Sequence, residues 1–146
     1  MSKLHNENTR VQVPAALHLC KLGYIYLDKI DSYDHSTNIL TGIFLSQLAK
    51  LNPLLSEQDC KNYLTKLIGC LNNEDLGKEF YSYVSSKSGV RLIDFDNPKN
   101  NTWHVTTEFT CENEDTKDNF RPDITCFING LPLAFIEVKK PNNMKV

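Results

Sequence analysis

The sequence predicts an α/β fold, with helices in the first half of the chain and β-strands in the second. Apolar residues recur at helical spacing as far as Gly89, and beyond it they alternate with the period of two that is typical of strands. The dipeptide Asn129-Gly130 separates two apolar runs, which is a strong signal for a β-hairpin. The length of 146 residues suits one domain that spans 1–146.

The first two helices are bounded by residues that start or stop a helix. The first is expected to open at Pro14, where a missing N–H costs nothing, and to close at Gly23. The second, over 40–51, is stopped by Pro53. Between them we expect a short strand and then an exposed loop, over residues 24–27 and 28–37.

The third helix has the clearest signals. Ser56 and Asp59 have the spacing of a capping box at its start. Its apolar stripe consists of Cys60, Tyr63, Leu64, Leu67, Ile68 and Leu71. Asn73 is expected to cap a fourth helix, whose apolar face would carry Leu76, Phe80, Tyr83 and Val84. We interpret these stripes as core and not as a cofactor site, because most such stripes are buried.

The second half of the chain predicts three strands and an acidic loop. Residues 102–111 alternate apolar and polar side chains, as in a half-buried strand. The segment 112–118 has four acids and one base, which is typical of a solvated loop. An acidic metal site there is the less favoured alternative, since nothing rigid holds these residues. The runs 124–128 and 133–138 form the hairpin.

Charge and cysteine content limit the kind of protein. With 16 Lys and Arg against 18 Asp and Glu, the net charge of −2 argues against a protein that coats nucleic acid by bulk positive charge. Five scattered cysteines without a Cys-x-x-Cys pair predict neither a disulfide framework nor structural zinc. Apolar stretches are too short to span a bilayer, and the polar start lacks a secretory signal, so we expect no membrane contact and a cytoplasmic location.

The hairpin carries acids and a base where a core strand should be apolar. Asp123 opens its first strand, and Glu137 and Lys139 lie two residues apart near the end of its second. Two carboxylates and the Val138 carbonyl would form an all-oxygen site for Mg²⁺, with Lys139 beside it to act on a bound water or a phosphate. A strand end with exposed charges and a capping Asp is the plainer alternative, and it is favoured on this short pattern alone.

A shared metal site requires a particular register of the hairpin. A regular ladder from a two-residue Asn129-Gly130 turn would pair Asp123 with Ile136 and turn the two carboxylates to opposite faces. Both must reach one ion at about 2.1 Å. The site therefore predicts a one-residue shift, through a three-residue loop or a bulge near Pro132.

The sequence around these residues resembles a known nuclease motif. Arg121-Pro122-Asp123-Ile124, the segment 127–133 and Ile136-Glu137-Val138-Lys139-Lys140-Pro141 resemble the N-terminal domain of the restriction (motor) subunit of type I restriction–modification enzymes. That domain belongs to the PD-(D/E)xK nuclease superfamily. Weaker likeness extends over residues 9–24, 38–52 and 75–80.

The resemblance implies a restriction-endonuclease-like core, in which a mixed sheet with a central hairpin is flanked by helices. It implies Mg²⁺-dependent cleavage of double-stranded DNA, with Asp123 and Glu137 as metal ligands and Lys139 as the motif lysine. In the family this domain is fused to an ATP-driven translocase, so ATP would bind outside 1–146, and it works with methyltransferase and specificity subunits. The chain would then be a fragment that lacks the helix after the hairpin.

One part of the site and one alternative to an enzyme stay open. Some superfamily members use an acid from a preceding helix, for which Glu74, Asp75 and Glu79 are candidates. The alternative to an enzyme is an inactive nuclease-fold module that touches DNA or partner subunits through basic side chains, namely Arg121, Lys139, Lys140 and Lys145. A small-molecule hydrolase is not supported, because no serine elbow or cysteine–histidine pair is readable.

Overall fold

A computed structural model describes residues 8–86, 88–112 and 119–139 of the chain. The elements of the first half are the π-helix η2 (Asn8–Gln12), α1 (Val13–Lys21), β1 (Ile25–Tyr26), α2 (Thr41–Leu51), α3 (Glu57–Leu71) and α4 (Lys78–Ser85). The second half contains the 3₁₀ turn η3 (Pro98–Asn100) and the strands β2 (Trp103–Thr107), β3 (Ile124–Ile128) and β4 (Leu131–Ile136).

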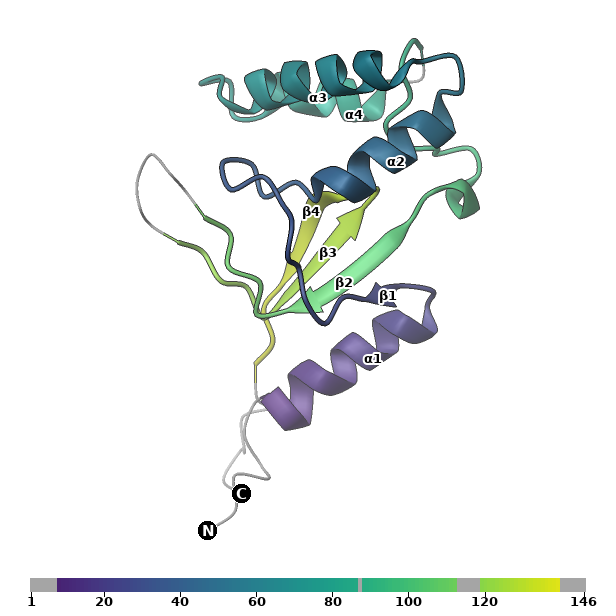
Figure 1. Ribbon diagram of the computed structural model, residues 1–146. Coiled ribbons are helices and arrows are strands. Elements are labelled where there is room, and N and C mark those ends of the chain that lie inside the picture. The colour runs from purple at the N-terminus through teal and green to yellow at the C-terminus, as the bar shows by residue number, and fades with distance from the viewer. Residues whose placement is uncertain (1–7, 87, 113–118, 140–146) are drawn as a thin grey trace, which may run out of the picture.

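The four strands form one mixed sheet in the order β1-β2-β3-β4. The short strand β1 runs parallel to β2, and β2, β3 and β4 form an antiparallel meander. Figure 1 shows α1 against one face of the sheet and α2 against the other, with α3 and α4 beyond α2. The predicted α/β fold, with a hairpin in a mixed sheet and a helical first half, is confirmed.

Three apolar clusters hold these layers together. Beneath α1, the fully buried Val105 and Ile124 pack with Cys126 and Val138. On the other face of the sheet, Phe127 is fully buried. The third and largest cluster joins α2, α3 and α4 to the hairpin turn and has as its buried members Ile39, Phe44, Leu48, Cys60, Leu67, Val84, Leu92, Ile93 and Leu131. The helical stripes predicted as core supply three of these buried members, Cys60, Leu67 and Val84, and most of their other apolar residues pack against the cluster partly buried.

The start of α3 agrees with the prediction, whereas the start of α4 does not. Ser56 and Asp59 form the expected capping box. Asn73 does not cap α4, because the chain makes a further turn before the helix begins at Lys78. The carboxylate of Asp75 accepts the N–H groups of Gly77 and Glu79 in its place. The extra turn also leaves Leu76 fully exposed, so its predicted place on the apolar face was wrong.

Strand β2 is shorter and more buried than its alternating pattern predicted. It ends at Thr107, because Glu108 has a positive φ of 54° and turns the chain out of the ladder. The polar side chains of His104 and Thr106 are buried as well as the apolar Val105. The prediction of a half-buried strand was therefore wrong, since β2 is covered on both of its faces.

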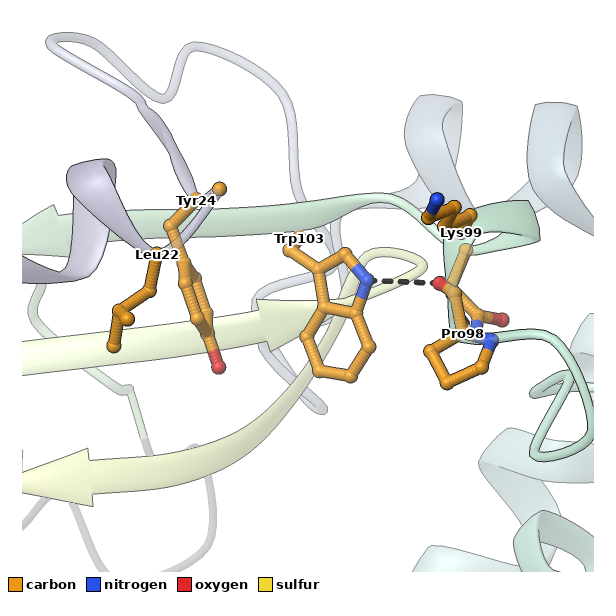
Figure 2. A pocket seen from close by; sticks show the side chains of 7 residues that line it. Leu22, Tyr24, Pro98, Lys99 and Trp103 are labelled. Carbon is orange, nitrogen blue, oxygen red and sulfur yellow. Dashed lines mark hydrogen bonds between the residues drawn. The ribbon is translucent and has the colours of Figure 1, made fainter.

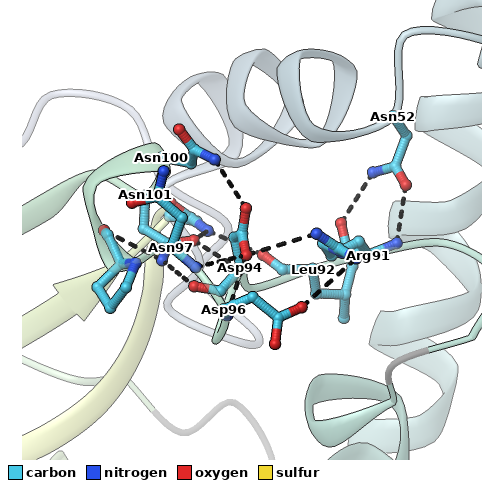
Figure 3. A network of polar contacts seen from close by, with 10 residues as sticks. Asn52, Arg91, Leu92, Asp94, Asp96, Asn97, Asn100 and Asn101 are labelled. Carbon is cyan, nitrogen blue, oxygen red and sulfur yellow. Dashed lines mark hydrogen bonds and ion pairs between the residues drawn. The ribbon is translucent and has the colours of Figure 1, made fainter.

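A polar network ties the loop before β2 to the hairpin turn. The side-chain Nδ2 atom of Asn129 donates to the Leu92 carbonyl at 2.8 Å and to Oδ1 of Asn101 at 2.9 Å. Asn101 in turn accepts the N–H of Asp94, and Asp94 accepts further bonds from its own loop (Figure 3). This network fixes the loop that leads into β2 against the turn between β3 and β4.

The remaining general expectations concern cysteines and membranes. The five cysteines are free; Cys60, Cys70 and Cys126 are buried, and Cys20 and Cys111 are half-buried. Within the described ranges, no helix has the length and apolar character that crossing a membrane would need.

Candidate functional site

The candidate site lies at the open end of the β3–β4 hairpin, and the turn at the other end sets its geometry. Asn129 and Gly130 have φ values of 51° and 83°, as a two-residue type I′ turn requires. A Cβ atom on Gly130 would lie 2.7 Å from the Leu40 carbonyl oxygen and 2.8 Å from the Phe44 nitrogen. Glycine is therefore required here both by the turn and by the close approach of the start of α2.

The ladder between β3 and β4 shifts by one residue on its way to the site. Next to the turn, Ile128 pairs with Leu131 and Phe127 with Pro132, but Cys126 then pairs with Ala134. Leu133 is the extra residue of this bulge. Beyond it the ladder continues regularly to the pair Ile124–Ile136. The predicted register shift near Pro132 is confirmed, and the two-residue turn is kept.

The shifted register brings Asp123 opposite Glu137 when it is continued by one residue pair. Ile124 and Ile136 both pack in the cluster beneath α1, so Asp123 and Glu137 belong to the opposite face of the sheet. Lys139, two residues after Glu137, follows the same alternation. Strand β4 ends at Ile136, two residues before the end of the predicted run 133–138, so Glu137 and Lys139 lie just past the strand.

Asp123 is held by three different segments of the chain. Its carboxylate oxygen Oδ2 accepts the N–H of Val138 at 2.8 Å. Its backbone carbonyl accepts the side-chain amide of Gln12 at 2.7 Å and the N–H of Glu108 at 3.0 Å. Asp123 is half-buried, whereas Glu137 and Lys139 are exposed. Asp123 is thus the fixed member of the predicted group, and the other two side chains reach into solvent.

The donor set suits a hard divalent cation. Two carboxylates on one face and a backbone carbonyl supply only oxygen, which Mg²⁺ prefers, and Mg²⁺ usually completes its shell with water and substrate phosphate. Since Oδ2 of Asp123 accepts the Val138 N–H, Oδ1 is the oxygen left for a cation. In the described ranges, no group of three or more His, Cys, Asp or Glu side chains could hold a metal ion. A cation here would therefore have only two carboxylate side chains as ligands, together with the Val138 carbonyl.

Of the basic candidates for DNA contact, Arg121 is tied to a carboxylate. Its guanidinium donates to Oε2 of Glu108 at 2.6 Å and to the Glu108 carbonyl at 3.1 Å. Lys139 is exposed near the end of the described chain. Lys140 and Lys145 lie outside the described residues.

The other acidic candidates are not brought to the site. Glu74 and Asp75 lie between α3 and α4, and Glu79 lies at the start of α4. This helical layer is far from the start of β3, where Asp123 lies (Figure 1). In the acidic segment, Glu112 accepts hydrogen bonds from Tyr33 and His35, and the His35 bond is the main reason that its pKa is lowered. Residues 113–118 lie outside the described part of the chain.

Comparison with known proteins identifies the family. The family profile "Type I restriction enzyme R protein N terminus" matches residues 5–146. The chain belongs to this family. A type I restriction enzyme endonuclease subunit of Methanocaldococcus jannaschii, MjaIXP, is 31% identical over 94% of this chain and 16% of its own length. A second one from that organism, MjaVIIIP, is 28% identical over 84% of this chain and 13% of its own length.

The match covers a small part of these relatives, since the chain spans about a sixth or less of their length. No solved structure is significantly similar to the chain. The family assignment of this R-subunit N terminus therefore rests on sequence similarity.

Two residues of this R-subunit N terminus touch Asp123 and were not predicted from the sequence. Gln12 is 3% exposed although it lies among apolar residues at the start of α1, and a buried amide of this kind needs a partner. Its place between two valines was the one signal for Gln12 in the sequence. Glu108 gave no signal, because a polar residue is expected at its place in the alternating run.

A pocket of about 530 Å³ lies at the opposite end of the sheet from Asp123. Trp103 stands edge-on to Tyr24 at 5.7 Å, and its indole N–H donates to the Pro98 carbonyl at 3.1 Å (Figure 2). Trp103 pairs with Ile128 beside the hairpin turn, five residues along β3 from Asp123. The pocket is therefore not part of the candidate site.

Proposed function

We propose that this domain is the nuclease domain of a type I restriction enzyme R subunit and hydrolyses phosphodiester bonds of double-stranded DNA with Mg²⁺. Asp123, Glu137 and the Val138 carbonyl would bind the cation, and Lys139 would act beside it. On this proposal the chain is a member of the PD-(D/E)xK superfamily. The observation that carries it is the register shift, because a regular hairpin would separate the two carboxylates of the motif.

The family membership supports the same reading independently of the geometry. The plainer alternative, an Asp that caps the segment after β4, accounts for the Val138–Asp123 bond but not for the position of Glu137 and Lys139 on the same face. Both relatives are endonuclease subunits by name, and their similarity covers most of this chain. A nuclease function explains both the position of the motif residues on one face and the similarity to endonuclease subunits.

The chemistry assigned to the chain is simple. A water oxygen bonds to phosphorus, the bond from phosphorus to one ester oxygen breaks, and a proton ends on the oxygen that leaves. When bound, Mg²⁺ would polarise the phosphate and lower the pKa of a bound water. Asp123 and Glu137 would orient the phosphate through the cation, and the Lys139 ammonium would offset the charge that develops on the phosphate oxygens.

The metal part of the proposal can be tested on the 146-residue chain with two substitutions of one residue. Asp123→Asn keeps an oxygen that can accept the Val138 N–H but removes the negative charge, whereas Asp123→Ala removes both. We expect Mn²⁺ to broaden the backbone amide signals around Val138 in the wild type and in neither variant. Glu112→Gln is the matched control, because it neutralises an acid outside the site and should broaden like the wild type. If the amide signals around Val138 broaden in Asp123→Asn at the same Mn²⁺ concentrations as in the wild type, the metal site is contradicted.

The catalytic part requires the full-length R subunit. We expect Glu137→Ala or Lys139→Ala to abolish DNA cleavage while DNA-stimulated ATP hydrolysis persists, because the motor would lie outside this domain. Loss of ATP hydrolysis in a correctly folded variant would show that the domain does something other than cut DNA.

The wider assembly is proposed on the family alone. We infer that the full-length subunit couples cleavage to ATP-driven translocation and works with methyltransferase and specificity subunits. A pull-down of these subunits with the full-length R subunit would test the assembly. If that complex binds DNA but does not cleave it, although Asp123, Glu137 and Lys139 are intact, the alternative of an inactive nuclease-fold module is favoured.

A further inference from the structure

The side chain of Arg121 donates two hydrogen bonds to a single residue, Glu108. Its Nη2 atom donates to Oε2 of Glu108 at 2.6 Å, and its Nε atom donates to the backbone carbonyl of the same residue at 3.1 Å. The two residues lie on the two strand ends that flank the acidic loop. The planar guanidinium can reach both acceptors at once because its donors form a rigid fork.

Glu108, which accepts these two bonds, has an unusual backbone conformation. Glu108 has a φ of 54°, which is uncommon for a residue other than glycine and persists only where the surroundings hold it. In this conformation its N–H donates to the carbonyl of Asp123 at 3.0 Å. The bond adds one rung beyond the last pair of the β2–β3 ladder, Thr107–Ile124.

These contacts form a chain from Arg121 through Glu108 to Asp123. The same Asp123 carbonyl also accepts the amide of Gln12, and the Asp123 carboxylate accepts the N–H of Val138. The backbone of Asp123 is thus held from two sides while its side chain meets the segment that carries Glu137. Loss of the rung from Glu108 would leave Gln12 alone to hold that carbonyl.

We propose that Arg121 is a positioning residue, which through Glu108 holds Asp123 in place, and that it does not contact DNA phosphate. The inference rests on the proposed function, because a precise place for Asp123 matters only if it shares a cation with Glu137. Two of the five guanidinium N–H donors are used by Glu108 and the charge is paired with the Glu108 carboxylate, which weakens the attraction of Arg121 for a phosphate. The pair is about half exposed, so its value lies in geometry more than in stability.

The two roles predict different results for Arg121→Lys. A lysine keeps the charge that a phosphate contact needs, but it cannot donate to the carbonyl and carboxylate of Glu108 in a fork. We expect Arg121→Lys and Arg121→Gln to speed hydrogen exchange of the Glu108 and Val138 amides by about tenfold in the 146-residue chain, because a bond to a charged group is lost. Arg91→Lys is the matched control, since Arg91 pairs with Asp94 and Asp96 in another loop and should leave both amides unchanged.

A second variant approaches the contact from the other partner. Glu108→Gly tolerates the positive φ and keeps the backbone carbonyl, but it removes the carboxylate. We expect the same faster exchange at Val138, with a thermal midpoint close to that of the wild type. Wild-type exchange in Glu108→Gly and Arg121→Lys would overturn the proposal.

DNA binding provides a readout that a structural role would not move. If Arg121 contacts phosphate, Arg121→Gln should reduce the slope of log K against log salt for a DNA duplex by about one, and Arg121→Lys should restore it. We expect the slope to stay unchanged in both. A reduced slope in Arg121→Gln that lysine restores would overturn the proposal. Absence of DNA binding by the wild type would contradict the proposed function, and the exchange comparison would still decide the role of Arg121.

Discussion

The backbone N–H of Val138 donates a hydrogen bond of 2.8 Å to Oδ2 of Asp123, two residues after β4 has ended at Ile136. A side chain thus continues the connection between the two strands where the backbone ladder stops. The bond keeps the segment with Glu137 and Lys139 beside the start of β3. The hairpin turn, the bulge at Leu133 and this bond together determine how the motif residues meet.

This bond predicts different stabilities for two changes of Asp123. Asp123→Ala should lower the free energy of unfolding by about 2 kcal/mol, because the Val138 N–H loses a charged acceptor. Asp123→Asn should cost less than about 1 kcal/mol, since its carbonyl oxygen still accepts. Urea unfolding of the three proteins measures both values. Equal losses for the two variants would mean that the charge, and not the hydrogen bond, stabilises this end of the hairpin.

Gly130→Ala should destabilise the fold strongly. The added Cβ would lie 2.7 Å from the Leu40 carbonyl oxygen, and alanine is disfavoured at a φ of 83°. We expect a loss of about 3 kcal/mol, from strain and overpacking together. Gly69→Ala is the control, because the space around Gly69 in α3 is open and the change should stabilise the helix by about 0.5–1 kcal/mol. Similar effects of both substitutions in thermal unfolding would contradict the close approach of α2 to the turn.

Asn129→Asp should destabilise the protein by about 3 kcal/mol. The side chain is 1% exposed, and its amide donates to Leu92 and Asn101. An aspartate tolerates the positive φ equally well but cannot make these two donations and would bury a charge. Asn62→Asp, on the exposed face of α3, should change the stability by less than about 0.5 kcal/mol. A small effect at Asn129 in chemical unfolding would mean that the network of Figure 3 adds little to stability.

His104 predicts a loss of stability in mild acid. It is 8% exposed, its Nδ1 atom has no hydrogen-bond partner among the described residues, and burial lowers its pKa from the ordinary value of 6.5. In the unfolded chain the imidazole takes up a proton as the pH falls below 6.5, while in the folded protein it stays neutral to a lower pH. The folded state is therefore fully stable above pH 6.5 with respect to this group and loses stability below it.

Thermal unfolding between about pH 7 and pH 5 measures this effect. The midpoint should fall more steeply in the wild type than in His104→Gln, which cannot titrate. His18→Gln is the control, because His18 lies exposed on α1 and its removal should leave the steep fall unchanged. Parallel curves for the wild type and His104→Gln would contradict a buried neutral imidazole.

The sequence by itself determined the features that depend on neighbours in the chain. The capping box of Ser56 and Asp59 and the turn at Asn129-Gly130 involve residues at most three apart, and both are present as predicted. The motif around Asp123 and Glu137 was also sufficient to predict the family. The same local reasoning failed at Asn73, where Asp75 is equally able to cap and lies closer to α4.

Only the tertiary structure decided which groups surround the motif. Gln12 reaches the Asp123 carbonyl across 111 residues of chain, and Glu108 does so from a strand end with a left-handed backbone. The motif predicted a register shift near Pro132, but only packing selected a bulge at Leu133, which buries Ile124, Ile136 and Val138 together beneath α1. Such contacts depend on how separate elements pack, and a hydrophobic pattern along one strand carries no information about the residues that will face it.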